Sequence, residues 1–475
     1  MCQRVAPNSF CNAPVYRCRN PLVPCDCEWS GVTLIPTSHT ESLPINAPIT
    51  HPSRPAGARA LPPVATGIPL RIALLGYRSS PYSGGQGVYL KYLSRGLKHL
   101  GHEVSVISGP PYPELDEGVA LVKLPSLDLY QNGLRSLRTH HLSDRLAIIE
   151  WLSKLSGGFA EPWTFGERAR EWLLAHRDQF DVVHDNQTLA DGIFDIQKAG
   201  IPLITTIHHP ISRDLRHALQ QEPQLHRRLF LRRWHLFLRM QSRVARKLNH
   251  LVTVSTPSRD DIVSDFGVDS SRLSVLPNGV DTALYRPLPG VRRHHCQIMA
   301  IASADVPMKG LSVLLRAASE LLAHFPDLQL LLVAKPRPGG ETERLIDALD
   351  LSARVRFVSD ISDEELVRHY AESTLAVVPS LYEGFGLPAV EAMACGVPLV
   401  SSDGGALAEV VGDGGVLVPA GNAGALAGAV AGLLSNPEKR QQLAKRARAR
   451  AEQRFCWNVC AAKMVDHYRR VIASC

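Results

Sequence analysis

Short apolar runs alternate with amphipathic stretches along the chain from Arg71 onward. Buried parallel strands appear in a sequence as short runs rich in Val, Ile and Leu, whereas the connecting helices have apolar residues at spacings of three and four. The first series of apolar runs lies at 71–76, 103–107, 181–184, 202–208 and 250–255, and the second at 297–302, 328–333, 354–358 and 375–378. Alternation of this kind is typical of doubly wound parallel sheets. The pattern therefore predicts an α/β protein with two Rossmann-like domains.

The length of 475 residues also favours two domains, because a single core stops growing below that size. The segment from Val275 to Pro287 contains the turn Asn278-Gly279 between prolines, which indicates a linker. We therefore expect a first domain at 68–287, a second domain at 288–455 and a terminal helix within 456–475.

The first 67 residues differ from the rest of the chain. They contain eleven of the 34 prolines and five of the ten cysteines, and they have no sustained apolar period. Such a composition predicts a disordered tail. A zinc knuckle formed by Cys11, Cys18, Cys25 and Cys27 is an alternative, although the spacing matches no established zinc pattern. A mis-assigned translation start is another.

The stretch VVPSLYEGFGLPAVEAMACGVPLV, residues 377–400, predicts a strand, a glycine loop and a short helix. Gly384 and Gly386 leave the backbone bare, and Pro388 suits the first turn of a helix. The helix should end at Cys395, because Gly396 can adopt the left-handed conformation that follows a helix. Unpaired N–H groups at the start of this helix are suited to the phosphates of a nucleotide.

Two carboxylates lie on either side of this predicted phosphate site. Glu383 precedes the glycines, and Glu391 follows Pro388 by three residues. Each carboxylate can accept two hydrogen bonds from neighbouring sugar hydroxyls. A nucleotide sugar is therefore the ligand that this stretch predicts, while the simpler alternative is a loop followed by a solvated helix face.

The spacing of Glu383 and Glu391 resembles the E-x7-E motif of retaining glycosyltransferases of family four, which include the bacterial-type group 1 enzymes. The resemblance extends from about Arg71 to Tyr468 and implies the GT-B fold, with the acceptor on the first domain and the donor on the second. It also implies that the terminal helix within 456–475 crosses back to the first domain. It implies that Glu383 contacts the donor sugar and Glu391 the ribose. The donor-binding residues between them would be Gly384, Phe385, Gly386 and Leu387.

The resemblance also extends to residues outside this stretch. Lys309 precedes a predicted helix at 311–325 and would contact the diphosphate, but the arginine that the family has six residues earlier is replaced by Ser303. His208 ends the sequence TTIH, similar to the family's strand ending in Thr-x-His, and would lie near the reacting centre. We expect Glu383, Lys309 and His208 to be the catalytic residues.

Gly84 and Gly85 belong to the loop SGGQG, which follows the first apolar run and would face the cleft in the resembled family. A tight turn without a ligand is the alternative. The loop does not have the spacing G-x-G-x-x-G, and the next strand ends in Ser108 rather than an acid, which excludes a nicotinamide cofactor. Further candidates are His184 and His209 at strand ends, for which a structural hydrogen bond and a place at the ligand edge are both open, and Gly404 and Gly405, expected to border the site.

The formal net charge of +7 comes from one segment. Residues 224–248 contain seven arginines and one lysine without an acid, so the rest of the chain has a net charge of −1. Apolar residues recur there at helical spacing, namely Phe230, Trp234, Phe237, Met240, Val244 and Leu248. One interpretation is a long helix packed on its own domain, and the other is a peripheral contact with anionic lipid. Nucleic acid is not expected, because no binding motif accompanies the charge.

We expect the protein in the cytoplasm, with the inner face of the membrane as a further location if segment 224–248 binds lipid. There is no apolar run of about 20 residues and no leader-like amino terminus. The cysteines include no C-x2-C pair and are expected to be reduced thiols. No Asp-x-Asp motif is present, so we expect no metal, and the only small-molecule requirement is the nucleotide-diphosphate sugar itself, as co-substrate.

The predicted function is transfer of a sugar, with retention, from a nucleotide diphosphate to a glycan, a lipid-linked acceptor or a small molecule. No carboxylate on the first domain is evident as a covalent nucleophile, so the sequence gives no support to double displacement. The resemblance implies that retention proceeds by front-side attack. Two alternatives remain. A nucleotide-sugar epimerase has the same fold, and a catalytically silent sugar-binding scaffold would explain the absent arginine.

Overall fold

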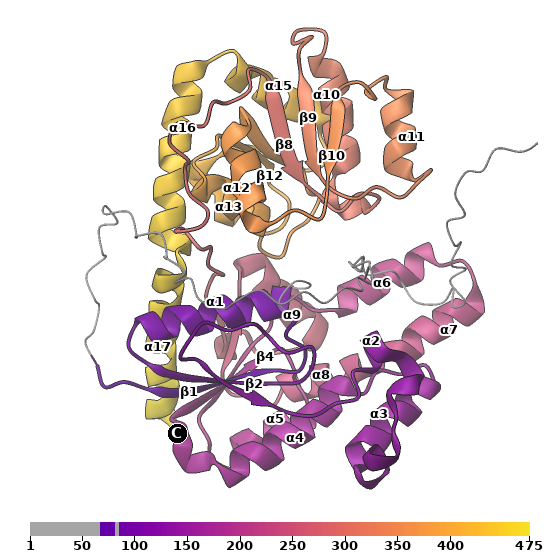
Figure 1. Cartoon of the computed structure of the whole chain (residues 1–475), viewed down its shortest axis with the longest axis vertical. Coiled ribbons are helices and arrows are strands. Elements are labelled where there is room, and N and C mark those ends of the chain that lie inside the picture. Colours follow the sequence, from indigo (N-terminus) through magenta and orange to yellow (C-terminus); the bar gives the residue numbers. More distant parts are fainter. Residues whose placement is uncertain (1–66, 81–84) are drawn as a thin grey trace, which may run out of the picture.

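The structure is a computed structural model, and it describes residues 67–80 and 85–475. Two parallel sheets, each covered by helices on both faces, form two domains that lie one above the other in Figure 1. The predicted pair of Rossmann-like domains is confirmed. The predicted disordered tail and the cysteines within it lie outside the described residues, as does Gly84.

The first domain has a seven-stranded sheet in the order β3-β2-β1-β4-β5-β6-β7. Its strands are β1 (Arg71–Gly76), β2 (Glu103–Ser108), β3 (Ala120–Lys123), β4 (Val182–Asn186), β5 (Leu203–Thr206), β6 (Leu251–Thr253) and β7 (Leu273–Val275). Its helices are α1 (Gly85–His99), α2 (Leu129–Asn132), α3 (Arg145–Leu155), α4 (Glu161–Ala175), α5 (Asp191–Lys198), α6 (Ser212–Gln221), α7 (Leu225–Trp234), α8 (Phe237–Ala245) and α9 (Thr256–Phe266).

The second domain has a six-stranded sheet in the order β10-β9-β8-β11-β12-β13. Its strands are β8 (Gln297–Ile301), β9 (Gln329–Val333), β10 (Val355–Val358), β11 (Leu375–Val378), β12 (Leu399–Ser402) and β13 (Val416–Val418). Its helices are α10 (Leu311–Leu321), α11 (Glu341–Ala348), α12 (Asp363–Glu372), α13 (Leu387–Ala394), α14 (Leu407–Val411), α15 (Ala423–Leu434) and α16 (Pro437–Arg450). The predicted boundary near Pro287 falls between β7 and β8.

In both sheets the strand order reverses beside the first strand. β1 pairs with β2 and β4, and β8 pairs with β9 and β11, all in parallel register. In open parallel sheets, ligands collect at the carboxyl ends of strands where the order reverses. The segments that follow β1, β4, β8 and β11 are therefore placed where a ligand would bind.

The terminal helix α17 (Trp457–Ser474) packs on the first domain although it follows the second. Figure 1 shows α16 and α17 in yellow along one side of both domains. Trp457 and Met464 belong to the same apolar cluster as Leu93 of α1, and Tyr468 is fully buried there. The terminal helix thus belongs to the core of the first domain, as the resemblance implied.

The prediction of one long helix at 224–248 is wrong. The segment forms α7 and α8, which are separated by His235 and Leu236. The backbone N–H groups of both residues bond to carbonyls of α7, so the helix ends before Phe237. The break changes which side chains are buried, because Leu231 and Leu238 enter the core while Phe230 and Trp234 of the predicted stripe are only half-buried.

Candidate active site

The glycine loop connects β11 to α13 and offers its backbone to the cleft. Gly386 caps α13 with φ of 96°, and a Cβ there would lie 2.5 Å from Leu407 Cδ2. Both the conformation and the contact require glycine. The Phe385 ring is buried against Phe455, with ring centroids 5.8 Å apart. Phe385 therefore has only its main chain available for a ligand, at the N-terminal end of α13 where N–H groups are unpaired.

Glu383 receives two hydrogen bonds on the same oxygen. Lys309 Nζ lies 2.8 Å from Glu383 Oε1, and Ser380 Oγ donates to that oxygen at 2.8 Å. Charge-assisted bonds of this kind fix a carboxylate strongly. The structure therefore brings two predicted site residues, Glu383 and Lys309, into direct contact. Ser380 was not predicted, although its position three residues before Glu383 in the same loop was the available signal.

Lys309 owes its position to close packing of two loops. It ends a short 3₁₀ turn, Pro307–Lys309, and the next residue, Gly310, has φ of 65°. A Cβ on Gly310 would lie 2.0 Å from the Pro379 carbonyl oxygen, and the Leu381 N–H donates to the Met308 carbonyl at 2.8 Å. The turn before α10 is thus fixed against the loop that contains Glu383.

Gly404 and Gly405 support the Glu383 loop from behind. A Cβ on Gly405 would lie 2.4 Å from the Glu383 carbonyl oxygen, and one on Gly404 would lie 2.4 Å from that of Leu381. The Ala406 N–H donates to the Glu383 carbonyl at 2.9 Å. These glycines therefore position the main chain of the loop by allowing close backbone contact.

Glu391 is half-buried on α13, and among the residues that the structure describes no cation forms an ion pair with it. Its Oε2 lies 3.4 Å from the Tyr370 hydroxyl, which also donates to the Pro388 carbonyl at 3.2 Å. Burial, with a smaller contribution from the charge of Asp363, raises the pKa of Glu391 to about 7. Hydroxyl groups that donate to this carboxylate would favour its ionised form, as the two hydroxyls of a ribose can.

His208 follows β5 and has a neutral imidazole. Burial lowers the pKa of His208 to about 3. Its Nε2 lies 2.7 Å from Asn186 Oδ1, and Asn186 Nδ2 donates to the Gln86 carbonyl at 3.1 Å. Since the amide oxygen of Asn186 can only accept, the hydrogen-bond network assigns the imidazole proton to Nε2.

The two domains meet at the glycine loop. Ser255 Oγ and Ser258 Oγ, at the start of α9, donate to the Gly384 carbonyl at 2.7 and 3.0 Å. A Cβ on Gly384 would lie 3.8 Å from His209 Cβ and 3.9 Å from the His208 carbonyl oxygen. The structure therefore places the predicted donor loop beside the strand end that contains His208. The two serines were missed, because Ser255 in STPS signals a helix start and nothing about its partner.

A second contact between the domains involves Tyr382 beside Glu383. The Tyr382 hydroxyl bonds to Asp261 of α9, and Arg213 of α6 forms an ion pair with the same carboxylate. The Arg213 guanidinium also lies over the Tyr382 ring, 5.3 Å from its centroid. Residue spacing carries no signal for this cluster, because its members come from three separate elements.

The loop SGGQG is only partly described. Gly85 begins α1, and a Cβ there would meet nothing within 4 Å, so this glycine borders open space. Gly87 is the one that packing requires, because its Cβ would lie 2.0 Å from the Ser80 carbonyl oxygen. The described geometry is compatible with a ligand near Gly85 and shows no contact of it with the other predicted site residues.

His184 has a structural environment, which is one of the two roles that the sequence left open. Its Nδ1 lies 2.6 Å from the Tyr468 hydroxyl and its Nε2 lies 2.7 Å from Thr206 Oγ1. Burial lowers the pKa of His184 to about 3. The imidazole is neutral and connects α17 to the sheet of the first domain. His209, in contrast, is exposed beside the glycine loop.

Two parallel α/β domains that meet at a glycine loop with an E-x7-E pair define a glycosyltransferase of the GT-B fold. Comparison with known families agrees. The family described as Glycosyltransferase Family 4 matches residues 83–284, and Glycosyl transferases group 1 matches residues 294–450. The chain belongs to this family of glycosyltransferases, and the comparisons give no support to the epimerase alternative.

Curated relatives cover most of the chain. The MMP alpha-(1->4)-mannosyltransferase of Mycolicibacterium hassiacum is 47% identical over 410 residues, which are 85% of this chain and 99% of that protein. The D-inositol 3-phosphate glycosyltransferase 2 of Catenulispora acidiphila is 30% identical over 441 residues, which are 85% of this chain and 96% of that protein.

Solved structures show the same fold. Sucrose-phosphate synthase from Thermosynechococcus elongatus has a TM-score of 0.62 and 24% identity, covering 86% of this chain and 100% of that one. Anabaena HepE in complex with UDP and glucose has a TM-score of 0.59 and 20% identity, covering 84% of this chain and 100% of that one. These two structures confirm the GT-B architecture.

Proposed function

We propose that the protein transfers mannose from a nucleotide-diphosphate donor to a 4-hydroxyl of a glycan, with retention of the α configuration. The mannosyltransferase that is 47% identical supports the choice of sugar and linkage. The contact of Glu383 with Lys309, next to the glycine loop and His208, is the structural observation that carries the proposal. Glu383 would bind the mannosyl hydroxyls, Lys309 and the start of α13 the diphosphate, and Glu391 the ribose.

Retention by front-side attack is supported by two carboxylates of the first domain that already have partners. Asp185 is fully buried and accepts from the N–H groups of Thr188 and Leu189. Asp261 is engaged by Tyr382 and Arg213. Neither is available as the covalent nucleophile that double displacement requires. The enzyme would then act mainly by stabilising the leaving diphosphate.

The charge for this stabilisation would come from the chain itself. Lys309 contributes an ammonium group, and the N-terminal end of α13 contributes unpaired N–H groups. Within residues 67–80 and 85–475, no group of three His, Cys, Asp or Glu side chains is arranged to hold a metal ion. We therefore propose a metal-independent reaction, in which EDTA leaves the rate unchanged.

His208 would orient the sugar through its remaining ring nitrogen. Because Nε2 donates to Asn186, Nδ1 is an acceptor for a sugar hydroxyl. A pKa of about 3 keeps this nitrogen unprotonated throughout the working pH range. His208 is therefore proposed as a catalytic residue that binds substrate and does not transfer a proton.

A transfer assay with anomeric analysis tests the proposal. The protein is incubated with GDP-, UDP- or ADP-sugars and an α-methyl mannoside, and the anomeric configuration of the product is determined by NMR. We expect an α-(1→4) mannoside as the product. We expect Glu383→Gln to lower the transfer rate by about 100-fold or more, the loss typical of one electrostatic contact in a transition state. Glu364→Gln, an exposed carboxylate on α12, is the matched control. A β-linked product, or an undiminished rate in Glu383→Gln, would overturn the assignment.

We also propose that α7 contacts anionic lipid, which would place the enzyme at the inner face of the membrane for a lipid-linked acceptor. Leu225 and Leu229 of α7 are 74% and 59% exposed, and Arg232 on the same helix is exposed as well. α7 packs beside the end of α3, where Leu152 and Leu155 are also exposed, and Figure 1 shows both helices at one end of the first domain. Exposed leucines with cations suit the membrane interface.

Sedimentation with vesicles tests this contact. No helix in the described part of the chain is long and apolar enough to cross a bilayer, so binding would be peripheral. We expect the protein to sediment with vesicles that contain anionic lipid at low salt, and the double variant Leu225→Glu/Leu229→Glu to stay in the supernatant. Leu417→Glu, an exposed leucine on β13 of the other domain, is the control. Absence of the wild-type protein from the pellet at low salt would refute the membrane contact.

A further inference from the structure

The position of the absent arginine, Ser303, lies in a row of residues at the edge of the second sheet. Ile301 of β8 is in register with Val333 of β9, and Val333 is in register with Val358 of β10. The ladders continue one residue further, through bonds from Ala302 N to the Val333 carbonyl and from Ala334 N to the Val358 carbonyl. Two residues beyond the paired positions are Ser303, Lys335 and Asp360. Lys335 therefore follows β9 at the same level at which Ser303 follows the neighbouring strand, β8.

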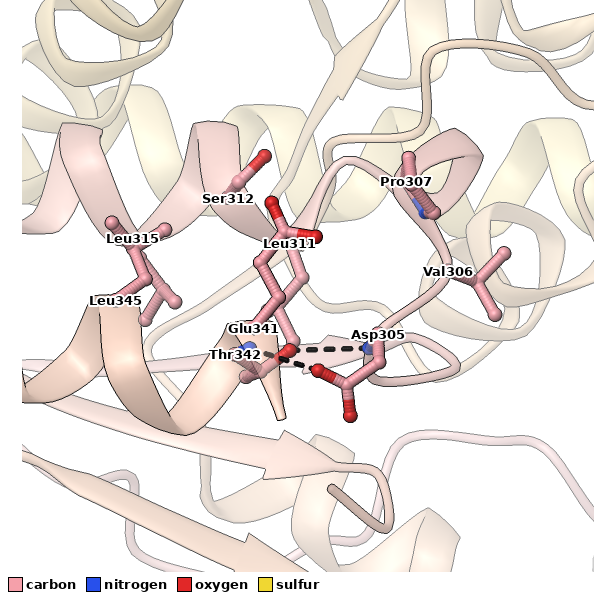
Figure 2. A pocket seen from close by; sticks show the side chains of 9 residues that line it. All are labelled: Asp305, Val306, Pro307, Leu311, Ser312, Leu315, Glu341, Thr342 and Leu345. Carbon is pink, nitrogen blue, oxygen red and sulfur yellow. Dashed lines mark hydrogen bonds between the residues drawn. The ribbon is translucent and has the colours of Figure 1, made fainter. Parts of the chain in front are cut away.

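Asp305 fixes the loop that contains Lys335 against the loop that contains Ser303. Its Oδ2 accepts from the Arg337 N–H at 2.9 Å and its Oδ1 accepts from the Thr342 N–H at 2.8 Å, while Asp305 N donates to Thr342 Oγ1 at 3.1 Å. Figure 2 shows Asp305 directed at Thr342, where α11 begins. A Cβ on Gly340 would lie 2.7 Å from Asp305 Oδ1, so glycine allows the close approach. The proximity of the two loops is therefore built in by specific contacts.

The Lys335 ammonium is available to a ligand. Its side chain is 71% exposed, and its ion-pair partner is Asp360 at 3.7 Å, itself 48% exposed. Exposed ion pairs of this kind contribute little to stability, so a ligand with more negative charge can displace the carboxylate. The four-carbon stem of lysine is longer than the spacing of about 4.8 Å between neighbouring strands. Lys335 can therefore turn from the end of β10 toward the end of β8.

The donor site needs a second cation. A nucleotide-sugar diphosphate carries two negative charges, whereas the charge of Lys309 is already balanced by Glu383 at 2.8 Å. The family pattern supplies the second charge with an arginine at the position of Ser303. A serine can donate a hydrogen bond but leaves the negative charge uncompensated.

We infer that Lys335 binds the donor diphosphate in this protein and takes the place of the arginine that family members have at position 303. The inference rests on the proposed function, because it assumes a nucleotide-diphosphate donor at the glycine loop. Lys335 would approach the diphosphate from the end of β9, and Lys309 would approach it from the turn before α10. Binding would also release Asp360 from its ion pair.

Calorimetric titration with nucleoside diphosphates tests the inference. The variants are Lys335→Ala, Ser303→Arg, the double variant with both changes, and Arg337→Ala as the control, since Arg337 is an exposed cation on the same loop. For the tightest of GDP, UDP and ADP, we expect Lys335→Ala to raise the Kd at least 10-fold and Arg337→Ala to change it less than 2-fold. Ser303→Arg should restore the affinity of Lys335→Ala to within 3-fold of wild type. The corresponding nucleoside should bind all variants equally, because it lacks the phosphates.

Three outcomes would overturn the inference. The first is an equal change in the Kd of the nucleoside diphosphate in Lys335→Ala and in Arg337→Ala. The second is a loss of nucleoside affinity in Lys335→Ala that parallels the loss of diphosphate affinity, which would place Lys335 at the base. The third is an equal gain in affinity from Ser303→Arg in the presence and in the absence of Lys335. The last outcome would show that the two positions act independently. If the wild-type protein binds none of the three diphosphates, the proposed function fails as well. If it binds one and Lys335→Ala binds equally well, only the inference fails.

Discussion

Replacing Glu391 by glutamine should stabilise the protein at alkaline pH while it weakens the site. Burial and the charge of Asp363 raise the pKa of Glu391 from 4.5 to about 7. The native state thus retains a proton that the unfolded chain loses between these pH values. The protonated carboxyl of Glu391 therefore contributes to the free energy of unfolding at low pH. This contribution is lost as the pH rises from about 4.5 to 7, and the loss is complete above pH 7. Glutamine has nearly the same shape, still accepts from Tyr370 and carries no charge.

The magnitude follows from the difference of about 2.5 between the two pKa values. At about 1.4 kcal/mol for each pKa unit, the upper limit of the effect on the free energy of unfolding is roughly 3.5 kcal/mol. Because the Glu391 side chain is only half-buried, solvent screening reduces this value, and we expect about 1.5 kcal/mol. For a domain of this size, that corresponds to a rise in Tm of about 3–6 °C at pH 8. At pH 5 the rise should be below about 2 °C, because Glu391 is then largely protonated.

Thermal denaturation of wild type and Glu391→Gln at pH 5 and pH 8 measures the effect. Glu383→Gln is the matched control, because it removes a carboxylate that is paired with Lys309 and should give no stabilisation at either pH. The donor Kd is measured in parallel and should rise at least 10-fold in Glu391→Gln, since an amide cannot accept two hydroxyls as a carboxylate does. An equal Tm difference at both pH values would show that burial does not disfavour the charge of Glu391. A lower Tm of the variant at pH 8 would reverse the sign of the reasoning.

Three further predictions concern other residues. Gly310→Ala should destabilise the second domain by about 2–4 kcal/mol in denaturant unfolding, because a Cβ would lie 2.0 Å from the Pro379 carbonyl oxygen. Gly339→Ala is the control, since Gly339 has a similar φ of 67° and its Cβ would meet nothing within 4 Å, and it should cost about 1 kcal/mol. Tyr468→Phe should lower the free energy of unfolding by about 1–2 kcal/mol, because buried His184 loses its partner, and an unchanged denaturation midpoint would contradict this. His208→Ala should lower kcat about 10- to 100-fold and leave the Kd of the nucleoside diphosphate unchanged. In the wild-type protein, the pH profile of kcat should show no ionisation of His208 between pH 5 and 8, since the pKa of His208 is about 3.

The sequence predicted the elements of the fold well because buried parallel strands have a simple signature. The run Leu375–Val378 and the capped helix after Gly386 were both predicted correctly, since apolar burial, a left-handed glycine and a proline are local features. The basic segment at 224–248 was predicted as one helix because its period continues through His235. Tertiary packing breaks the helix, so that Leu231 and Leu238 are buried while Phe230 and Trp234 are only half-buried. Val244 and Leu248 of the predicted stripe are buried as the period indicated.

Contacts between elements could not be predicted from spacing. The ion pair of Lys309 with Glu383 depends on Gly310, which allows the two loops to approach closely, and 74 residues separate the pair in the sequence. The serines that bond to the Gly384 carbonyl are more than 120 residues away from it. The predicted residue types were informative, but which of them meet is a property of the folded chain.

The two carboxylates of the E-x7-E pair differ in a way that their spacing does not reveal. Glu383 contacts an ammonium group and a serine hydroxyl, whereas Glu391 contacts the hydroxyl of Tyr370 and no cation. A carboxylate fixed by a cation keeps its geometry through a reaction, while one in a half-buried site with a pKa of about 7 gains its charge when hydroxyl groups bind. Donor binding and ionisation of Glu391 are therefore coupled, and donor affinity should increase with pH up to about 7 and then remain constant. The same coupling explains why the site can tolerate a buried acid that destabilises the free protein.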